Sequence, residues 1–447
     1  MASALHRPGL PRRSVVAAGA AVPLATAALA ACDGQAGRSG EGGGADRQAE
    51  LPRADFGDPE TAGAATIPFT ARMLGAIDRA DTNAVCSPLS AQIVLTMAGM
   101  GATGATRAQM EQTLGGSMDQ LAEAANTLAG ALLAVGEQQR QDPEEDQPDP
   151  AVASLVNGIW AQEGMSIQEQ FLDDLATWFG SGIYEVDYID PDHREEARQR
   201  INSWVEDVTD GLIQELIPAE ALSETSRMVL VNSLHLKASW TSSLTTATGP
   251  FTTADGEKIE VDTLLAETTT WHEDELCRAT ALDTYGSDLS LALIQPVTDL
   301  PSVLDAWAES ADDPSAGLGA VLAGLADDGE PVDLTLPAFD IDWNTPLSSV
   351  LIELGMADAF QAGEADFSGI TTEEELLISE VIQKAVITVD EEGMEAAAAT
   401  AAMLDTTSAA ADPKELVLDA PFLFVAYETS TRAPLVLGWI GDPAQTR

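Results

Sequence analysis

The sequence predicts an α+β domain with large antiparallel sheets, and three features lead to this prediction. Helical apolar spacing dominates the first part of the chain, whereas the second part is rich in strand patterns. Helices and strands do not alternate regularly, as they would in a parallel α/β fold. Between about residues 62 and 443, no stretch has the composition of an interdomain linker. The 447 residues therefore predict one large domain behind an unusual N-terminal segment.

The individual elements follow from the period of the apolar residues. The predicted helices cover residues 87–102, 106–115, 118–139, 166–179 and 192–213. The predicted strands cover residues 151–162, 226–240, 289–296, 331–343, 376–390 and parts of 421–443. Between the two groups, residues 140–150 are acidic and contain prolines, which is typical of a surface loop.

The charge limits the classes of partner. The net charge is −52, and a surface this acidic repels nucleic acid and anionic lipid. We therefore expect neither a nucleic acid nor a lipid surface to be bound directly. The hydrophobic content of 45% is ordinary for a globular core.

The first 31 residues form a targeting segment rather than part of the fold. A basic start, an apolar stretch and Leu29-Ala30-Ala31-Cys32 resemble a bacterial lipoprotein signal, in which Cys32 is lipidated. Arg12-Arg13 also resembles a twin-arginine export signal. The alternative is an uncleaved membrane anchor, which the Ala- and Gly-rich stretch 14–31 is only marginally long enough to form. We expect 32–61 to be a lipidated cysteine followed by a disordered tether.

Motifs of enzyme chemistry are absent from the sequence. It contains no HExxH, P-loop, CxxC or GxSxG pattern, so no nucleophile, base and orienting group come together. His272 is followed by Glu273 and Asp274, which could bind a metal weakly, but we favour a solvated polar turn. Export would permit Cys86 and Cys277 to form a disulfide, although buried free thiols are the simpler expectation. We expect no enzyme activity, no metal and no cofactor.

The stretch EEGMEAAAAT, residues 391–400 and here called the hinge stretch, has two interpretations. Alanine favours helix, and the stretch contains no residue that breaks one after Gly393. Alternatively, the stretch is a mobile segment built to become a strand, since side chains alternate between the two faces of a strand. One face would then carry Met394, Ala396, Ala398 and Thr400, and the other Glu395, Ala397 and Ala399. Neither face is bulky, so such a segment could enter an existing sheet.

Six spaced motifs settle the resemblance. The hinge stretch resembles the hinge of the serpins, a family of serine-protease inhibitors. Further similarities to that family, in the expected order, are VCSPLSAQIVLTMAGMGATGATRAQM, INSWVEDVTDGLIQELIP, LVNSLHLKASW, LGMADAF with ADFSGIT, and APFLFVAY. The resemblance covers residues 62–443, which implies a serpin fold with about eight to nine helices and an exposed reactive loop, residues 391–420.

The resemblance also implies a mechanism. A serpin offers its loop as bait, a serine protease cleaves it and becomes esterified to it, and the loop then inserts as a new strand. The protease is distorted before it can deacylate. The hinge residues Glu391, Glu392, Gly393, Met394, Glu395, Ala396, Ala397, Ala398, Ala399 and Thr400 are implied to insert.

Other roles carry over by position. Ser87, Ser90 and Asn232 match the serpin shutter beneath the sheet, and Trp240 matches the tryptophan where insertion begins. Gln383 stands where many serpins have a shutter histidine, so any pH dependence of that group is lost. Met394 replaces the usual Thr or Ser at the first inserting position, and its flexibility should still permit entry. Residues 118–139 carry no basic cluster, so a glycosaminoglycan cofactor of the familiar kind is not expected.

The family spacing places the reactive bond at Thr407–Ser408, with Ser408, Ala409 and Ala410 as alternatives. These small residues favour an elastase-like or subtilisin-like serine protease outside the cell. If the spacing differs, Leu404 or Met403 would suit a chymotrypsin-like enzyme. We expect a monomeric inhibitor, exported and lipid-anchored to the outer face of the bacterial cytoplasmic membrane. The alternative is a non-inhibitory serpin that serves as a cell-surface binding lipoprotein.

Overall fold

The structure is a computed structural model. It describes residues 45–446 except 80–81, 142–146, 210, 212, 220, 327–328, 330, 380 and 395–412. Contacts between Cα atoms divide the chain into two units, residues 1–42 and 43–447, and all the described residues belong to the second. Cys32, residues 395–400 of the hinge stretch, Thr407 and Ser408 lie outside the described residues.

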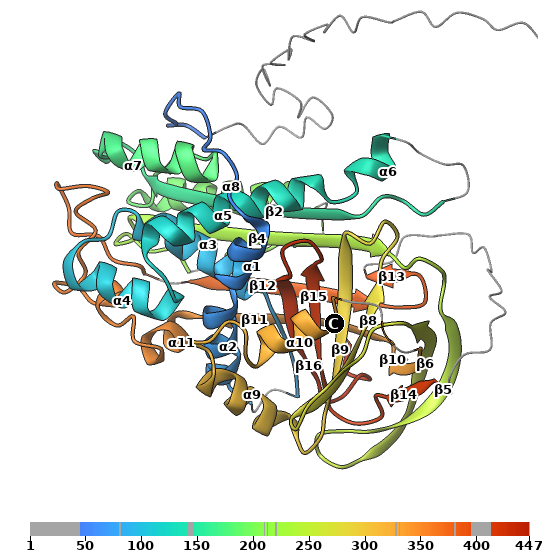
Figure 1. Cartoon of the computed structure of the whole chain (residues 1–447). Coiled ribbons are helices and arrows are strands. Elements are labelled where there is room, and N and C mark those ends of the chain that lie inside the picture. The colour runs from blue at the N-terminus through green and yellow to red at the C-terminus, as the bar shows by residue number, and fades with distance from the viewer. Residues whose placement is uncertain are drawn as a thin grey trace, which may run out of the picture. The chain divides into compact units, whose positions relative to one another are not determined.

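A six-stranded sheet, here called the central sheet, positions the hinge stretch (Figure 1). Its strands, in spatial order, are β11 (Phe339–Pro346), β12 (Ile382–Val389), β13 (Gly393–Met394), β4 (Met228–Ser239), β2 (Val152–Gln162) and β3 (Ile183–Val186). All neighbours are antiparallel except β2 and β3, which are parallel. The fold is therefore α+β with large antiparallel sheets, as the sequence predicts.

Two further sheets complete the strand-rich part of the domain. One contains β1 (Asn83–Cys86), β16 (Ala433–Ile440), β15 (Phe422–Glu428), β9 (Leu289–Pro296), β8 (Cys277–Asp283) and β7 (His272–Glu273), in that spatial order. The other contains β14 (Lys414–Val417), β10 (Val332–Pro337), β6 (Lys258–Thr268) and β5 (Thr245–Thr252). Because β14 begins two residues after the last of the undescribed residues 395–412, the chain that starts in one sheet at β13 continues into another.

Most helices come from the first half of the chain. They are α1 (Pro59–Ala64), α2 (Ile67–Ala76), α3 (Pro88–Gly99), α4 (Gly104–Leu114), α5 (Met118–Ala134), α6 (Glu137–Gln141), α7 (Glu169–Asp174) and α8 (Pro191–Val208). The second half adds α9 (Leu300–Glu309), α10 (Leu318–Gly324) and α11 (Ser348–Glu353). The described residues thus hold more α-helices than the eight to nine expected, because several are only one or two turns long. Every residue of α3 is buried, which places this helix in the core against β4 and β16.

Several elements are shorter than the sequence predicts, for local reasons. The helix predicted over 118–139 divides at Gly136, whose φ of +69° cannot continue a right-handed helix. The helix predicted over 192–213 ends at Val208, and Gly211 follows with a φ of +86°. The strand predicted over 376–390 begins only at Ile382, because the backbone of Val381 bonds instead to the start of α11. Apolar period alone does not reveal these interruptions.

The chain from residue 45 to residue 57, here called the N-terminal strap, is bound to the domain. Arg47 exchanges two backbone hydrogen bonds with Ile183 on the edge strand β3, of 2.9 and 2.8 Å. The buried Asn126 donates to the carbonyls of Ala54 and Asp55, both at 3.1 Å. These contacts correct the expectation of a disordered tether for this part of residues 32–61. The composition of the segment gave no sign of them, since the partners lie far along the chain.

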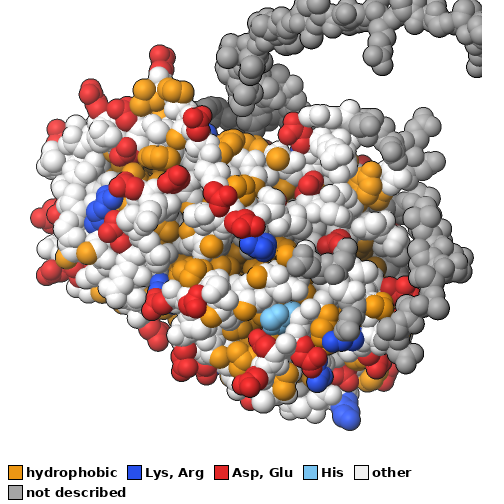
Figure 2. All heavy atoms as spheres, viewed as in Figure 1, with side chains coloured by type: hydrophobic (Ala, Val, Ile, Leu, Met, Phe, Trp, Pro, Cys, Tyr) orange, Lys and Arg blue, Asp and Glu red, His pale blue; other side chains and the backbone are white. Residues whose placement is uncertain are grey.

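The surface is acidic, as the composition implies. Figure 2 shows Asp and Glu side chains spread over the visible face, with few Lys or Arg side chains between them. In the described part of the chain, no helix combines the length and the apolar character that a membrane crossing requires.

Candidate functional site

The hinge stretch begins as a strand inside the central sheet. Gly393 pairs with Ser239 of β4, and Met394 pairs with Ala238 of β4 and with Val389 of β12. The side chain of Met394 is buried, with 2% of its surface exposed. At these two residues the strand interpretation of the hinge stretch is correct and the helix interpretation is wrong. The residues from Glu395 to Thr400 lie outside the described residues.

Trp240 anchors the turn that leads into β13. Its backbone N–H donates to the carbonyl of Glu392 at 2.9 Å, and its indole Nε1–H donates to the carbonyl of Asp390 at 2.8 Å. The N–H of Leu244 donates to the carbonyl of Glu391 at 2.8 Å. The buried Trp240 therefore lies at the point where the hinge stretch enters the sheet.

Asp390 and Gly393 complete the turn. The carboxylate Oδ1 of Asp390 accepts hydrogen bonds from the N–H groups of Glu392 and Gly393, at 2.9 and 3.1 Å. A side chain on Gly393 would place Cβ 2.3 Å from the carbonyl oxygen of Ala238, so only glycine permits this approach to β4. Asp390 belongs to none of the sequence motifs that indicate the site. Its place between a strand and a glycine is the signal of an Asx turn that could have identified it.

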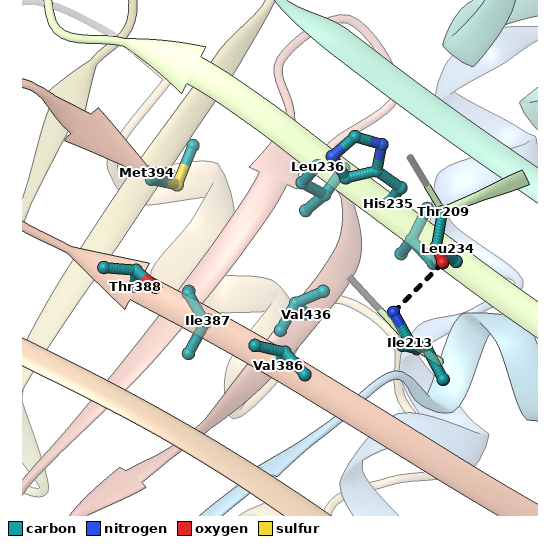
Figure 3. Close-up of a pocket in the computed structure, with 10 residues that line it drawn as sticks. All are labelled: Thr209, Ile213, Leu234, His235, Leu236, Val386, Ile387, Thr388, Met394 and Val436. Carbon is teal, nitrogen blue, oxygen red and sulfur yellow. Dashed lines mark hydrogen bonds between the residues drawn. The ribbon is translucent and has the colours of Figure 1, made fainter. Parts of the chain in front are cut away.

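Beneath Met394, a small cavity of about 30 Å³ separates β4 from β12 (Figure 3). Leu234, His235 and Leu236 line it from β4, and Val386, Ile387 and Thr388 line it from β12. Met394 closes one end, while Thr209, Ile213 and Val436 cover the two faces of the sheet. The cavity is large enough for about one water molecule. The place that a longer β13 would fill is therefore narrow and lined mainly by apolar side chains.

A second group of residues lies lower on β12 and contacts the start of α3. The side-chain amide of Gln383 accepts from the N–H of Ser87 at 2.9 Å and donates to the carbonyl of Ser87 at 2.7 Å. The hydroxyl of Ser87 donates to the hydroxyl of Ser90 at 2.8 Å. Ser87, Ser90 and Gln383 are all buried, so the structure brings together three of the predicted shutter residues. For Asn232, the structure describes only the backbone, which pairs with Asn157 of β2.

The variant Gln383→Leu is expected to lower the free energy of unfolding by about 2 to 4 kcal/mol. Leucine has a similar size but leaves the buried N–H of Ser87 without a partner, which costs about 1–3 kcal/mol. It also removes one of two hydrogen bonds to the carbonyl of Ser87, worth about 1 kcal/mol, while the bond from the N–H of Ala91 at 3.2 Å remains. Urea denaturation followed by tryptophan fluorescence measures the difference. The control Gln361→Leu changes an exposed glutamine and should leave the midpoint unchanged. Equal midpoints for both variants would refute the role assigned to Gln383.

The remaining candidate residues, His235, Cys86 and Cys277, are buried in the core. His235 is buried within β4 at 6% exposure, as expected for a core histidine. Cys86 and Cys277 are buried free thiols, as expected, and burial raises the pKa of each to about 12. Neither thiol is therefore a ready nucleophile near neutral pH.

Comparison with known proteins decides the family. A family model described as "Serpin (serine protease inhibitor)" matches residues 64–443. The chain belongs to the serpin family. Among curated relatives, it is 31% identical to Iripin-8 of Ixodes ricinus over 80% of this chain and 88% of that protein. It is 30% identical to a serine protease inhibitor of Cyanea capillata, over 82% and 93% of the two chains. It is 26% identical to an uncharacterised serpin-like protein of Methanosarcina acetivorans, over 84% of each chain.

Solved structures agree on the fold. The native state of the thermophilic serpin tengpin has a TM-score of 0.73, with 23% identity over 89% of this chain and 97% of that one. Native Arabidopsis AtSerpin1 has a TM-score of 0.71, with 24% identity over 88% of this chain and 100% of that one. The fold is therefore the serpin fold. Serpins are in general inhibitors of proteases and are typically not enzymes, which agrees with the missing catalytic motifs.

Proposed function

We propose that this serpin inhibits a serine protease as a suicide substrate, by inserting its reactive loop between β4 and β12. The observation that carries the proposal is β13, which is paired on both edges by the two strands that would flank an inserted loop. Insertion would then be the lengthening of a strand that has already begun, which avoids the cost of starting a new ladder.

The pairs already formed define the register of the remaining hinge residues. Because Met394 pairs with Ala238 and with Val389, antiparallel continuation would place an inserted Glu395 between Lys237 and Thr388. The same continuation would place an inserted Thr400 between Asn232 and Gln383, at the proposed shutter. The register therefore links the hinge stretch to the two separate groups of residues described above.

The register also assigns a face to each inserting side chain. Residues that are directly opposite share a face of the sheet. Val389, Ile387, Ala385 and Gln383 are buried, whereas Thr388, Val386 and Lys384 are half-buried. Met394, Ala396, Ala398 and Thr400 would therefore face the core. Glu395 would face outward beside Lys237, where opposite charges attract by about 0.2–1 kcal/mol.

The inserting side chains suit rapid entry. The cavity beneath Met394 has little free volume, so each inserted side chain must be small or displace its neighbours. Three of the four inward positions after the hinge glycine would be alanine or threonine, and Met394 is already buried. The new ladder would supply backbone hydrogen bonds worth on the order of 1 kcal/mol each.

For the target, we propose an elastase-like or subtilisin-like protease that cleaves at Thr407–Ser408. The argument is the small size of the residues at the family's reactive position, which fill a small specificity pocket. We further propose export and anchoring through Cys32, which rests on the signal sequence. Cells that express Cys32→Ser should release the protein from the membrane fraction, and unchanged membrane association would refute the anchor.

Denaturing gels test the inhibitory mechanism. Mixing the serpin with subtilisin or pancreatic elastase should produce a band at the summed mass that resists SDS, because the protease stays esterified to the loop. Mass spectrometry of the released peptide should place the cleavage after Thr407. Cleavage without a trapped band by every serine protease tested would contradict the inhibitor proposal and favour a non-inhibitory binding protein.

A further inference from the structure

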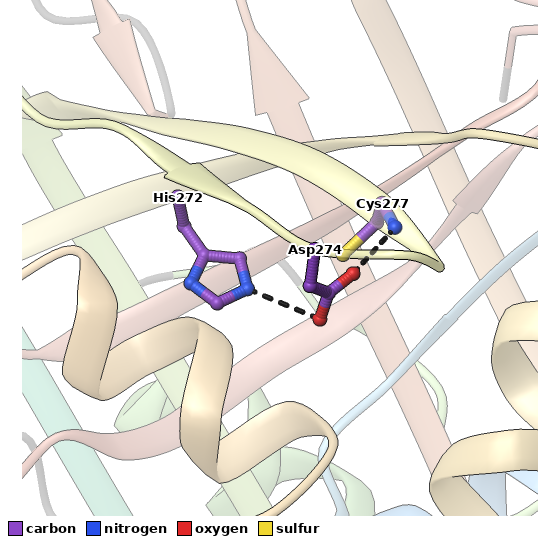
Figure 4. Close-up of side chains that lie close together, drawn as sticks. All are labelled: His272, Asp274 and Cys277. Carbon is purple, nitrogen blue, oxygen red and sulfur yellow. Dashed lines mark hydrogen bonds and ion pairs between the residues drawn. The ribbon is translucent and has the colours of Figure 1, made fainter.

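Away from the hinge, three side chains with metal-binding atoms gather on the hairpin of β7 and β8 (Figure 4). His272 lies in β7, Asp274 lies in the turn and Cys277 begins β8. One potential ligand atom from each residue lies within 4.8 Å of the others. The sequence draws attention to His272, Glu273 and Asp274 but not to Cys277. Cys277 joins them because the two-residue strand β7 pairs back onto β8.

The carboxylate of Asp274 is fixed by the turn itself. Its Oδ1 accepts hydrogen bonds from the N–H groups of Leu276 and Cys277, both at 2.8 Å. This leaves Oδ2, which lies 3.2 Å from Nε2 of His272. Two ligands of a tetrahedral ion with bonds of about 2.1 Å lie about 3.4 Å apart. The imidazole and carboxylate are therefore already separated as two ligands of one ion would be.

The other two potential ligands, His272 and Cys277, are largely shielded from solvent. The side chain of His272 is only 15% exposed, and Cys277 is fully buried. The imidazole rests against Gly324 at the end of α10, where an added Cβ would lie 2.4 Å from Nδ1 of His272. The absence of a side chain at Gly324 thus makes room for the imidazole ring. This packing of the ring distinguishes the group from a solvated acidic turn.

We infer that His272, Asp274 and Cys277 bind one thiophilic divalent transition-metal ion, of which Zn²⁺ is the representative. Sulfur, imidazole nitrogen and carboxylate oxygen are together the ligand set of Zn²⁺, whereas Mg²⁺ and Ca²⁺ require mainly oxygen. His272 would bind through Nε2, Asp274 through Oδ2 and Cys277 through Sγ. The thiol proton passes to solvent on binding, and water takes the fourth position.

The ion would join the two strands of the hairpin next to the strand that follows the reactive loop. Lys414, the first residue of β14, lies with Nζ 4.7 Å from the centre of the Trp271 ring. The same Nζ lies 4.0 Å from Oε2 of Glu273. Because Trp271 and Glu273 flank His272, an ion that stiffens this hairpin would also hold the contacts of Lys414. The inference is a structural site and does not depend on the proposed inhibitory mechanism.

Cobalt titration tests the site directly. The full chain, freed of metal with a chelator, is titrated with Co²⁺, whose bond to a thiolate gives a near-ultraviolet charge-transfer band. We expect about one equivalent to bind and Zn²⁺ to displace it. The same Zn²⁺ should raise the melting temperature, since a ligand that binds only the folded state stabilises it.

Matched variants identify the ligands. Cys277→Ala should abolish the band, whereas Cys86→Ala and Cys32→Ser, which remove the other two cysteines, should retain it. His272→Gln, a change at a partly exposed side chain that should fold normally, should weaken Co²⁺ binding by tenfold or more. Absence of a band in the unmodified chain, or a band that survives Cys277→Ala, would overturn the inference. Zn²⁺ stabilisation that is equal in His272→Gln would also overturn it.

Discussion

The double variant Glu395→Ala, Ala396→Glu is expected to be cleaved by the target protease without trapping it. The exchange keeps composition and charge, but the register of β13 turns the carboxylate from the outward face to the inward one. There it would lie beside Ile387, which is buried at 7% exposure. Burying a polar group without a partner costs several kcal/mol, and about 1.4 kcal/mol is a factor of ten in rate. Loop insertion should therefore become slower than deacylation of the protease, and the protease should be released active.

The measurement is the molar ratio of serpin to protease needed for complete inhibition. This ratio should rise by tenfold or more in the double variant, while the cleavage site stays the same. The control Glu395→Ala removes only the outward carboxylate and its attraction to Lys237, so its ratio should change less than about threefold. Similar ratios for the double variant and the control would show that the faces are assigned incorrectly.

Cleavage within the reactive loop is expected to raise the melting temperature by on the order of 20 °C. Insertion would add roughly ten backbone hydrogen bonds, each worth about 1 kcal/mol net. For domains of 150–250 residues, 1 kcal/mol shifts the midpoint by about 2–4 °C, and the effect is smaller in a longer chain. Differential scanning calorimetry of intact and cleaved protein measures the rise.

The double variant also serves as the matched control for that rise. Its loop should be cleaved equally well, but its melting temperature should increase by clearly less than that of the unmodified chain. A cleaved chain that melts at the same temperature as the intact one would exclude a new strand in the central sheet.

The sequence predicts the core elements of this fold well. Strands with long apolar runs, such as β2, β4 and β9, lie within a residue or two of the predicted ranges, because burial on both faces dominates their composition. The N-terminal strap was mistaken for a tether, since its order depends on Asn126 and on the edge of β3. Contacts of this kind join residues far apart in the chain and have no local pattern.

The candidate site likewise contains some residues that the sequence predicts and others that it does not. Trp240, Gly393 and Met394 were predicted from family position, and the structure brings them together at the head of β13. Asp390 was overlooked because its role is a turn rather than a motif. Cys277 could not be assigned to His272 and Asp274 from spacing alone, since only the hairpin of β7 and β8 closes the group. Sequence patterns do not predict the site residues whose positions are set by a turn or a hairpin.

Hydrogen–deuterium exchange of β4 and β12, before and after loop cleavage, tests the central claim most directly. Residues 234–236 and 384–388 line the place between the two strands where the loop is proposed to insert. After cleavage, peptides that contain these residues should exchange at least tenfold more slowly, because the backbone of an inserted strand would form ladder hydrogen bonds with both strands. Unchanged exchange in both strands, in a chain whose loop has been cut, would contradict insertion between β4 and β12.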